Sequence, residues 1–168
     1  IAALQGTVPD DKLQEKASSL AKEWFNRALD NGLAMFQGNL RNIYIDEADF
    51  GNARRVAKTA AELGNPAMML YTGLDCHENG KFEDAFTWFT KGAALGQSES
   101  ISELADYYYH FYDAKNLRCT IPYDPVKAIG LYRRAATKEF SDAGYTALQA
   151  AFGYIFHIGH LPLDWGLI

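Results

Sequence analysis

A short helical segment recurs four times along the chain of 168 residues, and this repetition constrains the fold more than any other feature. In every copy, a large apolar side chain is followed two positions later by a base and three positions later by a small residue. The large side chains are Phe25, Val56, Phe89 and Tyr132, and the bases are Arg27, Lys58, Lys91 and Arg134. Self-similarity at intervals of about 20–50 residues is typical of solenoids, in which each unit packs on its neighbours.

The repeated segments have the periodicity of amphipathic helices. In the first of them, the apolar residues between Ala17 and Leu29 fall at i, i+3, i+4, i+7 and i+8. Glycine follows three of the helices, at Gly32, Gly64 and Gly96, where a left-handed residue ends a helix. Partner helices are predicted between them, at 33–46, 66–77, 98–113 and 141–158. The sequence therefore predicts an all-α fold, an α-solenoid of stacked antiparallel helix pairs with about four repeats.

The length is that of a single domain with a sizeable core, and we expect one helical-repeat domain over 1–168. Its predicted parts are an extended lead-in (1–10), divergent repeats (11–63), the clearest repeats (64–140) and a partial terminal repeat or cap (141–168). The chain starts with isoleucine, not methionine, which is expected of a processed or trimmed form.

Two stretches resemble a known repeat family. ENGKFEDAFTWFTKGAALGQ (78–97) and IPYDPVKAIGLYRRAA (121–136) are similar to the Sel-one-like repeat, a bacterial type of the tetratricopeptide superfamily. The family pattern is a glycine-containing loop, an acid, an alanine, an aromatic pair and a double alanine. The matching residues are Gly80, Asp84, Ala85, Trp88, Phe89 and Ala93–Ala94, then Asp124, Ala128, Leu131, Tyr132 and Ala135–Ala136. The first helices of the pairs match less well, because the family's Leu-Gly before a Tyr is missing from ISELADYYYHFY (101–112).

This resemblance implies a non-catalytic scaffold that binds other proteins. Such repeats also occur in bacterial proteins that neutralise secreted toxins of competitors, and in regulators of secretion and envelope functions. We therefore expect a partner protein bound in the concave groove, and an immunity protein that occludes a toxin is the leading specific hypothesis. The alternatives are a regulatory or assembly scaffold of a bacterial envelope or secretion system and, in another class, a hydrolase built on a solenoid frame.

The charge balance and the motifs exclude several other functions. A formal net charge of −5 without a basic cluster argues against nucleic acid as the partner. No apolar run approaches the roughly 18–20 residues of a membrane span. Nucleophile elbows, phosphate loops and zinc-protease motifs are missing, so no enzyme, cofactor or small-molecule substrate is expected. A bacterial cytoplasmic or periplasmic location is expected, and the sequence does not choose between them.

The cysteines and histidines offer weaker signals. Cys76 and Cys119 are 43 residues apart, like their two repeat units, so they should occupy equivalent places about 10 Å apart. Because a disulfide needs Cα atoms within about 7 Å, two thiols are favoured over a bridge, although the loop 114–123 leaves the bridge open. The pairs or clusters that suggest a metal, His157 with His160 and Asp75–His77, lack the further ligands of a metal site.

The aromatic run YYYHFY (107–112) carries the predicted binding site. On a helical wheel Tyr108 and Tyr112 belong to the core, and Tyr109 and Phe111 lie at its shoulders. The two residues expected to point into the groove are Tyr107 and His110, with Glu103 beside His110. An exposed tyrosine is a good anchor for a partner, since it has a large area and a hydroxyl group. The predicted protein-binding residues are Tyr107, His110, Glu103 and Phe111.

Overall fold

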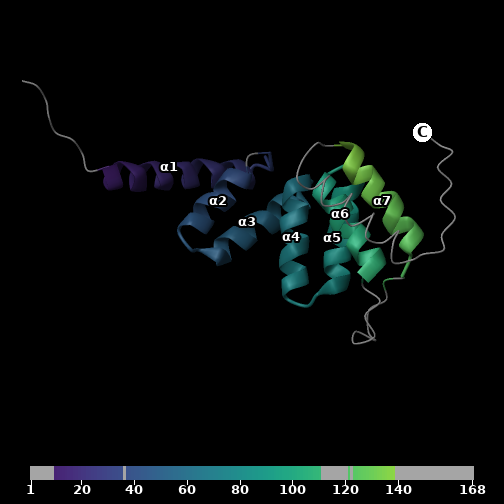
Figure 1. The fold of residues 1–168 in the computed structure, drawn as a ribbon. Coiled ribbons are helices and arrows are strands. Elements are labelled where there is room, and N and C mark those ends of the chain that lie inside the picture. Colours follow the sequence, from purple (N-terminus) through teal and green to yellow (C-terminus); the bar gives the residue numbers. More distant parts are fainter. Residues whose placement is uncertain (1–9, 36, 111–120, 122, 139–168) are drawn as a thin grey trace, which may run out of the picture. The chain divides into compact units, whose positions relative to one another are not determined.

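The computed structural model describes residues 10–35, 37–110, 121 and 123–138, which form seven α-helices and no strand (Figure 1). The helices are α1 (Asp10–Asp30), α2 (Gln37–Asp46), α3 (Phe50–Glu62), α4 (Pro66–Glu78), α5 (Phe82–Ala94), α6 (Ser98–His110) and α7 (Pro125–Lys138). The predicted all-α class is confirmed. The partner helices predicted at 33–46, 66–77 and 98–113 correspond to α2, α4 and α6, and the one predicted at 141–158 lies outside the described residues. None of the described helices is long and apolar enough to cross a membrane.

One type of turn ends the first five helices. The second residue after each of these helices has a positive φ, and the glycines at this position are Gly32, Gly64, Gly80 and Gly96. After α3, for example, the Gly64 N–H donates to the Ala61 carbonyl and the Asn65 N–H donates to the Ala60 carbonyl, both at 3.0 Å. These are the two hydrogen bonds of the Schellman motif, so the three glycine positions predicted from the sequence are confirmed. After α2 the same place is taken by Ala48, with φ 57.

The next helix starts directly after such a turn. Asp49 follows Ala48, and its carboxylate accepts a hydrogen bond from the Asn52 N–H at 3.1 Å at the start of α3. The Asn65 side chain accepts from the Met68 N–H at 3.2 Å in the same way at the start of α4. A left-handed residue followed by an N-cap stops one helix and begins the next within two or three residues. This local sequence pattern sets the short connections of the repeat.

Contacts divide the chain into two compact units, 1–72 and 73–168. In the first unit, α1 and α3 both pack against α2, around the buried side chains of Leu29, Leu40 and Val56. The fully buried Gln37 amide donates to the Leu33 carbonyl at 2.9 Å. In this unit the repeat position occupied by Phe25 is half-buried, whereas Val56 is completely buried.

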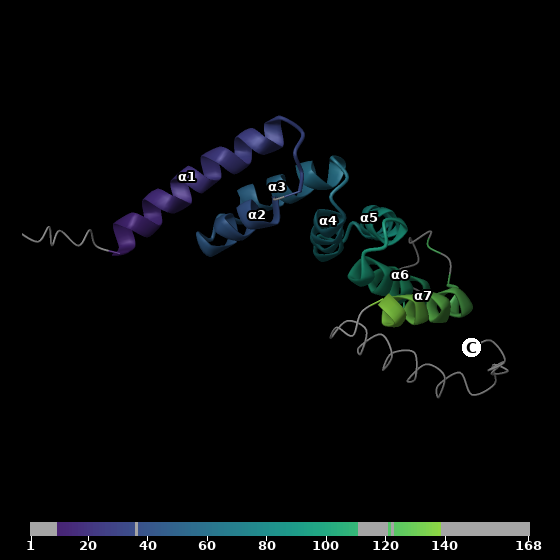
Figure 2. The same ribbon diagram turned by 90° about the horizontal axis from the view of Figure 1, so that it is seen from above.

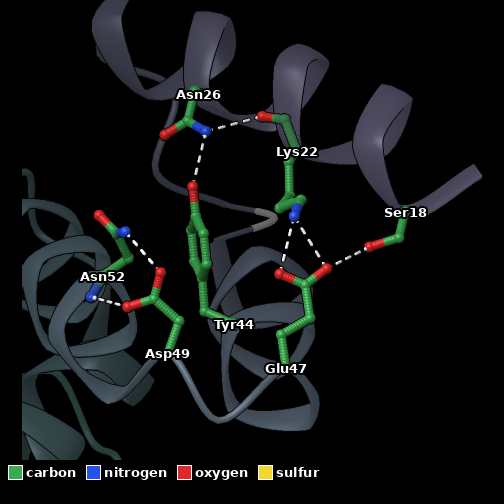
Figure 3. A network of polar contacts seen from close by, with 7 residues as sticks. All are labelled: Ser18, Lys22, Asn26, Tyr44, Glu47, Asp49 and Asn52. Atoms are coloured by element: carbon green, nitrogen blue, oxygen red, sulfur yellow. Dashed lines mark hydrogen bonds and ion pairs between the residues drawn. The ribbon is translucent and has the colours of Figure 1, made fainter. Parts of the chain in front are cut away.

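A polar network joins α1 to the turn between α2 and α3 (Figure 3). Lys22 of α1 donates to both carboxylate oxygens of Glu47, at 2.8 and 2.7 Å, and the Ser18 hydroxyl donates to the same carboxylate at 2.8 Å. The Asn26 amide donates to the Tyr44 hydroxyl at 3.2 Å. The hydrogen bond from Lys22 and then that from Ser18 lower the pKa of Glu47 below its usual 4.5.

In the second unit α6 packs against both α5 and α7 (Figure 2). The repeat positions Phe89 and Tyr132 are 0% and 1% exposed, as a core position requires. The ring of Phe89 lies directly on Gly73 of α4, where a Cβ would come within 2.5 Å of a ring carbon. Gly73 therefore lets the α4 backbone and this ring approach more closely than any other residue type would allow.

Three of the recurring bases contact aromatic rings or a backbone carbonyl of the protein's own helices. Lys91 and Arg27 lie over the rings of Trp88 and Trp24, three residues earlier on the same helix, at 4.3 and 5.4 Å from the ring centroids. The Arg134 guanidinium donates to the Ala93 carbonyl at 2.6 Å, in the last turn of α5. Cations at helix C-termini satisfy free carbonyls and complement the helix dipole. These contacts give Arg27, Lys91 and Arg134 a structural role.

Candidate protein-binding face

Tyr107 lies in the core, so the prediction that it points into a groove is wrong. Only 2% of this residue is exposed. Its hydroxyl is 2.7 Å from Nδ1 of His77 at the end of α4, and its ring makes edge contacts with His77 and Phe89 at centroid distances of 5.6 and 5.5 Å. A third ring, that of Phe86, lies 6.1 Å away. Tyr107 therefore joins α6 to α4 and α5 and is no contact residue for a partner.

The error has a physical cause. A helical wheel centred on Ile101, Leu104 and Tyr108 describes a helix that is covered from one side. In this unit the aromatic side chains of α5 and the last turn of α4 also cover the flank of α6 on which Tyr107 lies. The buried arc is therefore wider on that side, and it includes Ser100, which is completely buried.

Tyr108 is 7% exposed, so its predicted place in the core is confirmed. Its ring meets the edge of Phe86 at 5.4 Å on the α5 side. On the α7 side, the Lys127 ammonium group donates to the Tyr108 hydroxyl at 2.8 Å and lies 4.2 Å from the ring centroid. Tyr109 is half-buried, as expected of a shoulder position, and Phe111, Tyr112 and the His110 side chain lie outside the described residues.

With the tyrosines in the core, the other face of α6 is acidic. Glu99, Glu103 and Asp106 follow one another at i, i+4 and i+7, and this spacing puts them on one stripe of the helix. By register His110 is the next position on the same stripe, at i+11. Glu99 is exposed, and Glu103 and Asp106 are half-buried. We call Glu99, Glu103 and Asp106 the acidic stripe.

Glu103 is the unusual member of the acidic stripe. Among the described residues, no hydrogen bond or ion pair reaches its carboxylate. Burial, and then the charge of Asp106, raise the pKa of Glu103 above its usual 4.5. The fold therefore keeps a carboxylate in a place where its charge is poorly solvated and repelled by a neighbouring acid, and this costs stability at neutral pH.

Asp106 has a structural partner. The Tyr132 hydroxyl of α7 donates a short hydrogen bond to its carboxylate, which links the two helices. Tyr132 is the large side chain of the last repeat and is buried. Asp106 thus holds α7 against α6, and Glu103 is the carboxylate of this pair that remains available for an incoming group.

The described part of the structure shows no metal site at the cysteine and histidine clusters considered from the sequence. Asp75, Cys76 and His77 follow one another on α4, where the ring nitrogen of His77 faces Tyr107. Within the described ranges, no group of three or more His, Cys, Asp or Glu side chains is placed to hold a metal ion. Cys119, His157 and His160 lie outside the described residues, so the predictions that rest on them stay predictions.

The sequence contains the signal for the acidic stripe. Glu103 lies beside His110 on the wheel, and the same spacing rule adds Glu99 and Asp106. The link from Asp106 to Tyr132 could not be read from the sequence, since it depends on how α7 docks.

In the part of the chain that the structure describes, seven helices with recurring Schellman turns and equivalent buried positions define a helical-repeat protein. No protein-family model matches the chain, and no curated protein matches it significantly. Among solved structures, the chain is similar to a protective antigen present in uropathogenic Escherichia coli strains that displays an SLR (Sel-one-like repeat) fold, with a TM-score of 0.66 and 20% sequence identity. The likeness covers 85% of this chain and 30% of the antigen, so the chain spans less than a third of the antigen's length. The α-solenoid and the Sel-one-like repeat fold predicted from the sequence are confirmed.

Proposed function

We propose that this chain is a non-catalytic helical-repeat protein that binds another protein through the acidic stripe of α6. The observation that carries the proposal is Glu103, a half-buried carboxylate without a partner among the described residues, between two further acids. Residues retained at a cost to stability are frequent at functional sites. A repeat fold of this kind supports protein binding, and the location of the partner on α6 is the new element.

The chemistry of the acidic stripe indicates what kind of partner it can bind. An arginine or lysine that reaches Glu103 would relieve the repulsion from Asp106 and form a charge-assisted hydrogen bond with a carboxylate that is already partly desolvated. The net charge of −5 would in addition attract a basic protein during encounter. We therefore expect a partner that presents a basic side chain on its contact surface.

The more specific form of the proposal is inhibition by occlusion, as in bacterial toxin immunity. An inhibitor of a toxin with a basic active site needs an acidic surface, and the acidic stripe meets this need. A regulatory or assembly scaffold would use the same face with a partner that is not inhibited. Co-expression with the product of the neighbouring gene separates the two, because only an immunity protein restores growth in the presence of a toxin.

The test is a quantitative pull-down from the source organism with three forms of the chain. The wild type, a Glu99→Gln/Glu103→Gln variant and a Glu62→Gln control are compared by mass spectrometry. Glu62 is an exposed acid in α3, so its substitution changes a charge outside α6. Support is a protein captured by the wild type and by the control and depleted at least tenfold with the double variant. Equal capture by all three forms refutes the proposed face.

One observation favours the alternative of a hydrolase, namely two carboxylates close together with a raised pKa for one of them. In a hydrolase, Glu103 would act as a general acid beside an ionised Asp106. Asp106, however, accepts the hydrogen bond from Tyr132 that joins α6 to α7, which is a structural use of this carboxylate. Protein binding therefore remains the better interpretation of the pair.

A further inference from the structure

α1 has two opposite faces, and only one of them packs on the rest of its unit. The packed face includes Leu29, which is 4% exposed, and the polar side chains of Ser18 and Lys22 that reach Glu47. On the opposite side, Leu13, Leu20 and Trp24 are 53%, 54% and 60% exposed. The first turns of α1 also extend beyond the end of α2 in both views of the fold (Figures 1 and 2).

The exposed apolar residues form a regular seam. Leu13, Ala17, Leu20 and Trp24 are separated by four, three and four residues, which is the alternating spacing of the a and d positions in a coiled coil. The seam is about 17 Å long, because each of the roughly eleven steps from Leu13 to Trp24 rises by about 1.5 Å along the helix. All four side chains are exposed, so within the described residues they cover no core. A seam of this kind is suited to a second helix.

The charged residues beside the seam can form ion pairs with the same residues of a second copy of the chain. Lys16 and Glu23 each precede a seam residue that stands at an a position, so both occupy g positions. When two such helices pair in antiparallel orientation, with Leu13 opposite Trp24 and Ala17 opposite Leu20, the g position of one helix meets the g position of the other. Lys16 then faces Glu23 of the second copy, and by symmetry this contact forms twice. In a parallel pair, Lys16 would instead face Ala21.

We propose that α1 is a self-association surface, on which the α1 helix of a second copy of this chain docks in antiparallel orientation. The contact is isologous, since the same residues serve on both sides of a two-fold axis. Leu13 and Trp24 of the two copies pack at the ends of the seam, and the Lys16–Glu23 pairs set its direction. Glu23 already forms an exposed ion pair with Arg27 at 3.1 Å, which is weak enough to be shared or exchanged.

The length of the seam limits the strength of the dimer. Stable interfaces bury about 1,000 Å² or more, and a seam of three helical turns lies at or below that size. We therefore expect a reversible dimer with a dissociation constant in the micromolar range, and a monomer at lower concentrations. This inference does not depend on the proposed function, because the acidic stripe lies on α6 in the other unit.

Sedimentation velocity between about 1 and 200 μM tests the proposal, with charge-swapped variants as matched controls. Lys16→Glu leaves two acids facing each other across the antiparallel seam, and Glu23→Lys leaves two bases. Each variant alone should dimerise about tenfold more weakly than the wild type, because two attractive contacts become repulsive. A mixture of the two variants should recover the affinity, since every contact is then again between opposite charges.

Leu20→Glu gives a second test. It should abolish the dimer while the far-ultraviolet circular dichroism and the melting temperature stay those of the monomer, because the Leu20 side chain is exposed in the single chain. A wild type that remains monomeric up to 200 μM overturns the proposal, as it would if residues 1–9 of the same chain cover the seam. A dimer whose affinity is the same in the single variants and in their mixture overturns the antiparallel pairing.

Discussion

Tyr107→Ala tests the assignment of the aromatic run most sharply, because the two interpretations of Tyr107 predict opposite results. The side chain is 2% exposed and lies among the rings of Phe86 and Phe89 and of His77. Removing a buried aromatic side chain costs about 3–5 kcal/mol of unfolding free energy. For a chain of this size each kcal/mol lowers the melting temperature by about 2–4 °C, so a loss of roughly 6–20 °C is expected.

Tyr107→Phe separates the hydroxyl from the ring. It keeps the ring contacts and removes the hydroxyl that forms the hydrogen bond with Nδ1 of His77, and the loss of such a bond costs about 0.5–1.5 kcal/mol. Tyr123→Ala is the matched control, because this tyrosine is 47% exposed and its ring lies 6.1 Å from that of Tyr109. We expect the control to cost about 1 kcal/mol.

Urea unfolding followed by circular dichroism measures all three variants, with the slope against urea checked for a constant value. If Tyr107→Ala costs no more than Tyr123→Ala, Tyr107 is not part of the core and the packing of α6 on α4 and α5 is wrong. A cost of 3 kcal/mol or more for Tyr107→Ala, with a small cost for Tyr107→Phe, supports the aromatic cluster.

Three further predictions concern single positions. Gly73→Ala should lower the free energy of unfolding in urea by about 1–2 kcal/mol, because the new methyl group collides with the Phe89 ring. Gly130→Ala in α7 is the control: nothing lies within 4 Å of the new Cβ, so this change should stabilise the protein by up to about 1 kcal/mol. If both changes stabilise the protein, the close approach of Phe89 to Gly73 is wrong. Ala48→Gly should stabilise the protein by about 0.5–1 kcal/mol and so raise its melting temperature, because glycine adopts a φ of 57 without strain. A lower melting temperature would show that Ala48 is not left-handed. The lowered pKa of Glu47 means that its ion pair stabilises the first unit above about pH 4.5 and stops doing so as the pH falls through the lower folded-state value. Melting curves from pH 7 to pH 3 should therefore show a smaller acid loss in Glu47→Gln than in the wild type, and identical pH profiles would exclude this contribution.

Much of the fold could be predicted from the sequence because it depends on local patterns. The glycines at Gly32, Gly64 and Gly96 indicate the helix ends, and large side chains at equivalent positions, such as Phe89 and Tyr132, indicate the core of the later repeats. These signals need only the backbone preferences of a few residues and the 3.6-residue period. The predicted helix boundaries accordingly agree with the structure to within a few residues.

The site was harder to predict because it depends on neighbours that are distant in the sequence. Tyr107 is buried by His77, thirty residues earlier, and Asp106 is engaged by Tyr132, twenty-six residues later. A wheel drawn for α6 alone contains neither contact. The same wheel places Glu103 opposite the core, where its role in binding stays a prediction, whereas Tyr107 lies on a flank that α4 and α5 cover.

The central claim is that Glu103 is kept for binding at a cost to stability, and Glu103→Gln tests it in one pair of measurements. Because the pKa of Glu103 is raised in the folded state, its ionised form destabilises the protein above that pKa, and the penalty fades as the pH falls toward the unfolded-state value. The variant should therefore melt at a higher temperature than the wild type at pH 7, and this difference should shrink toward pH 4. At pH 7 it should also retain at least tenfold less of the partner protein captured by the wild type. A variant that is more stable and binds less supports the account, and a variant that melts no higher and binds the partner as the wild type does contradicts it.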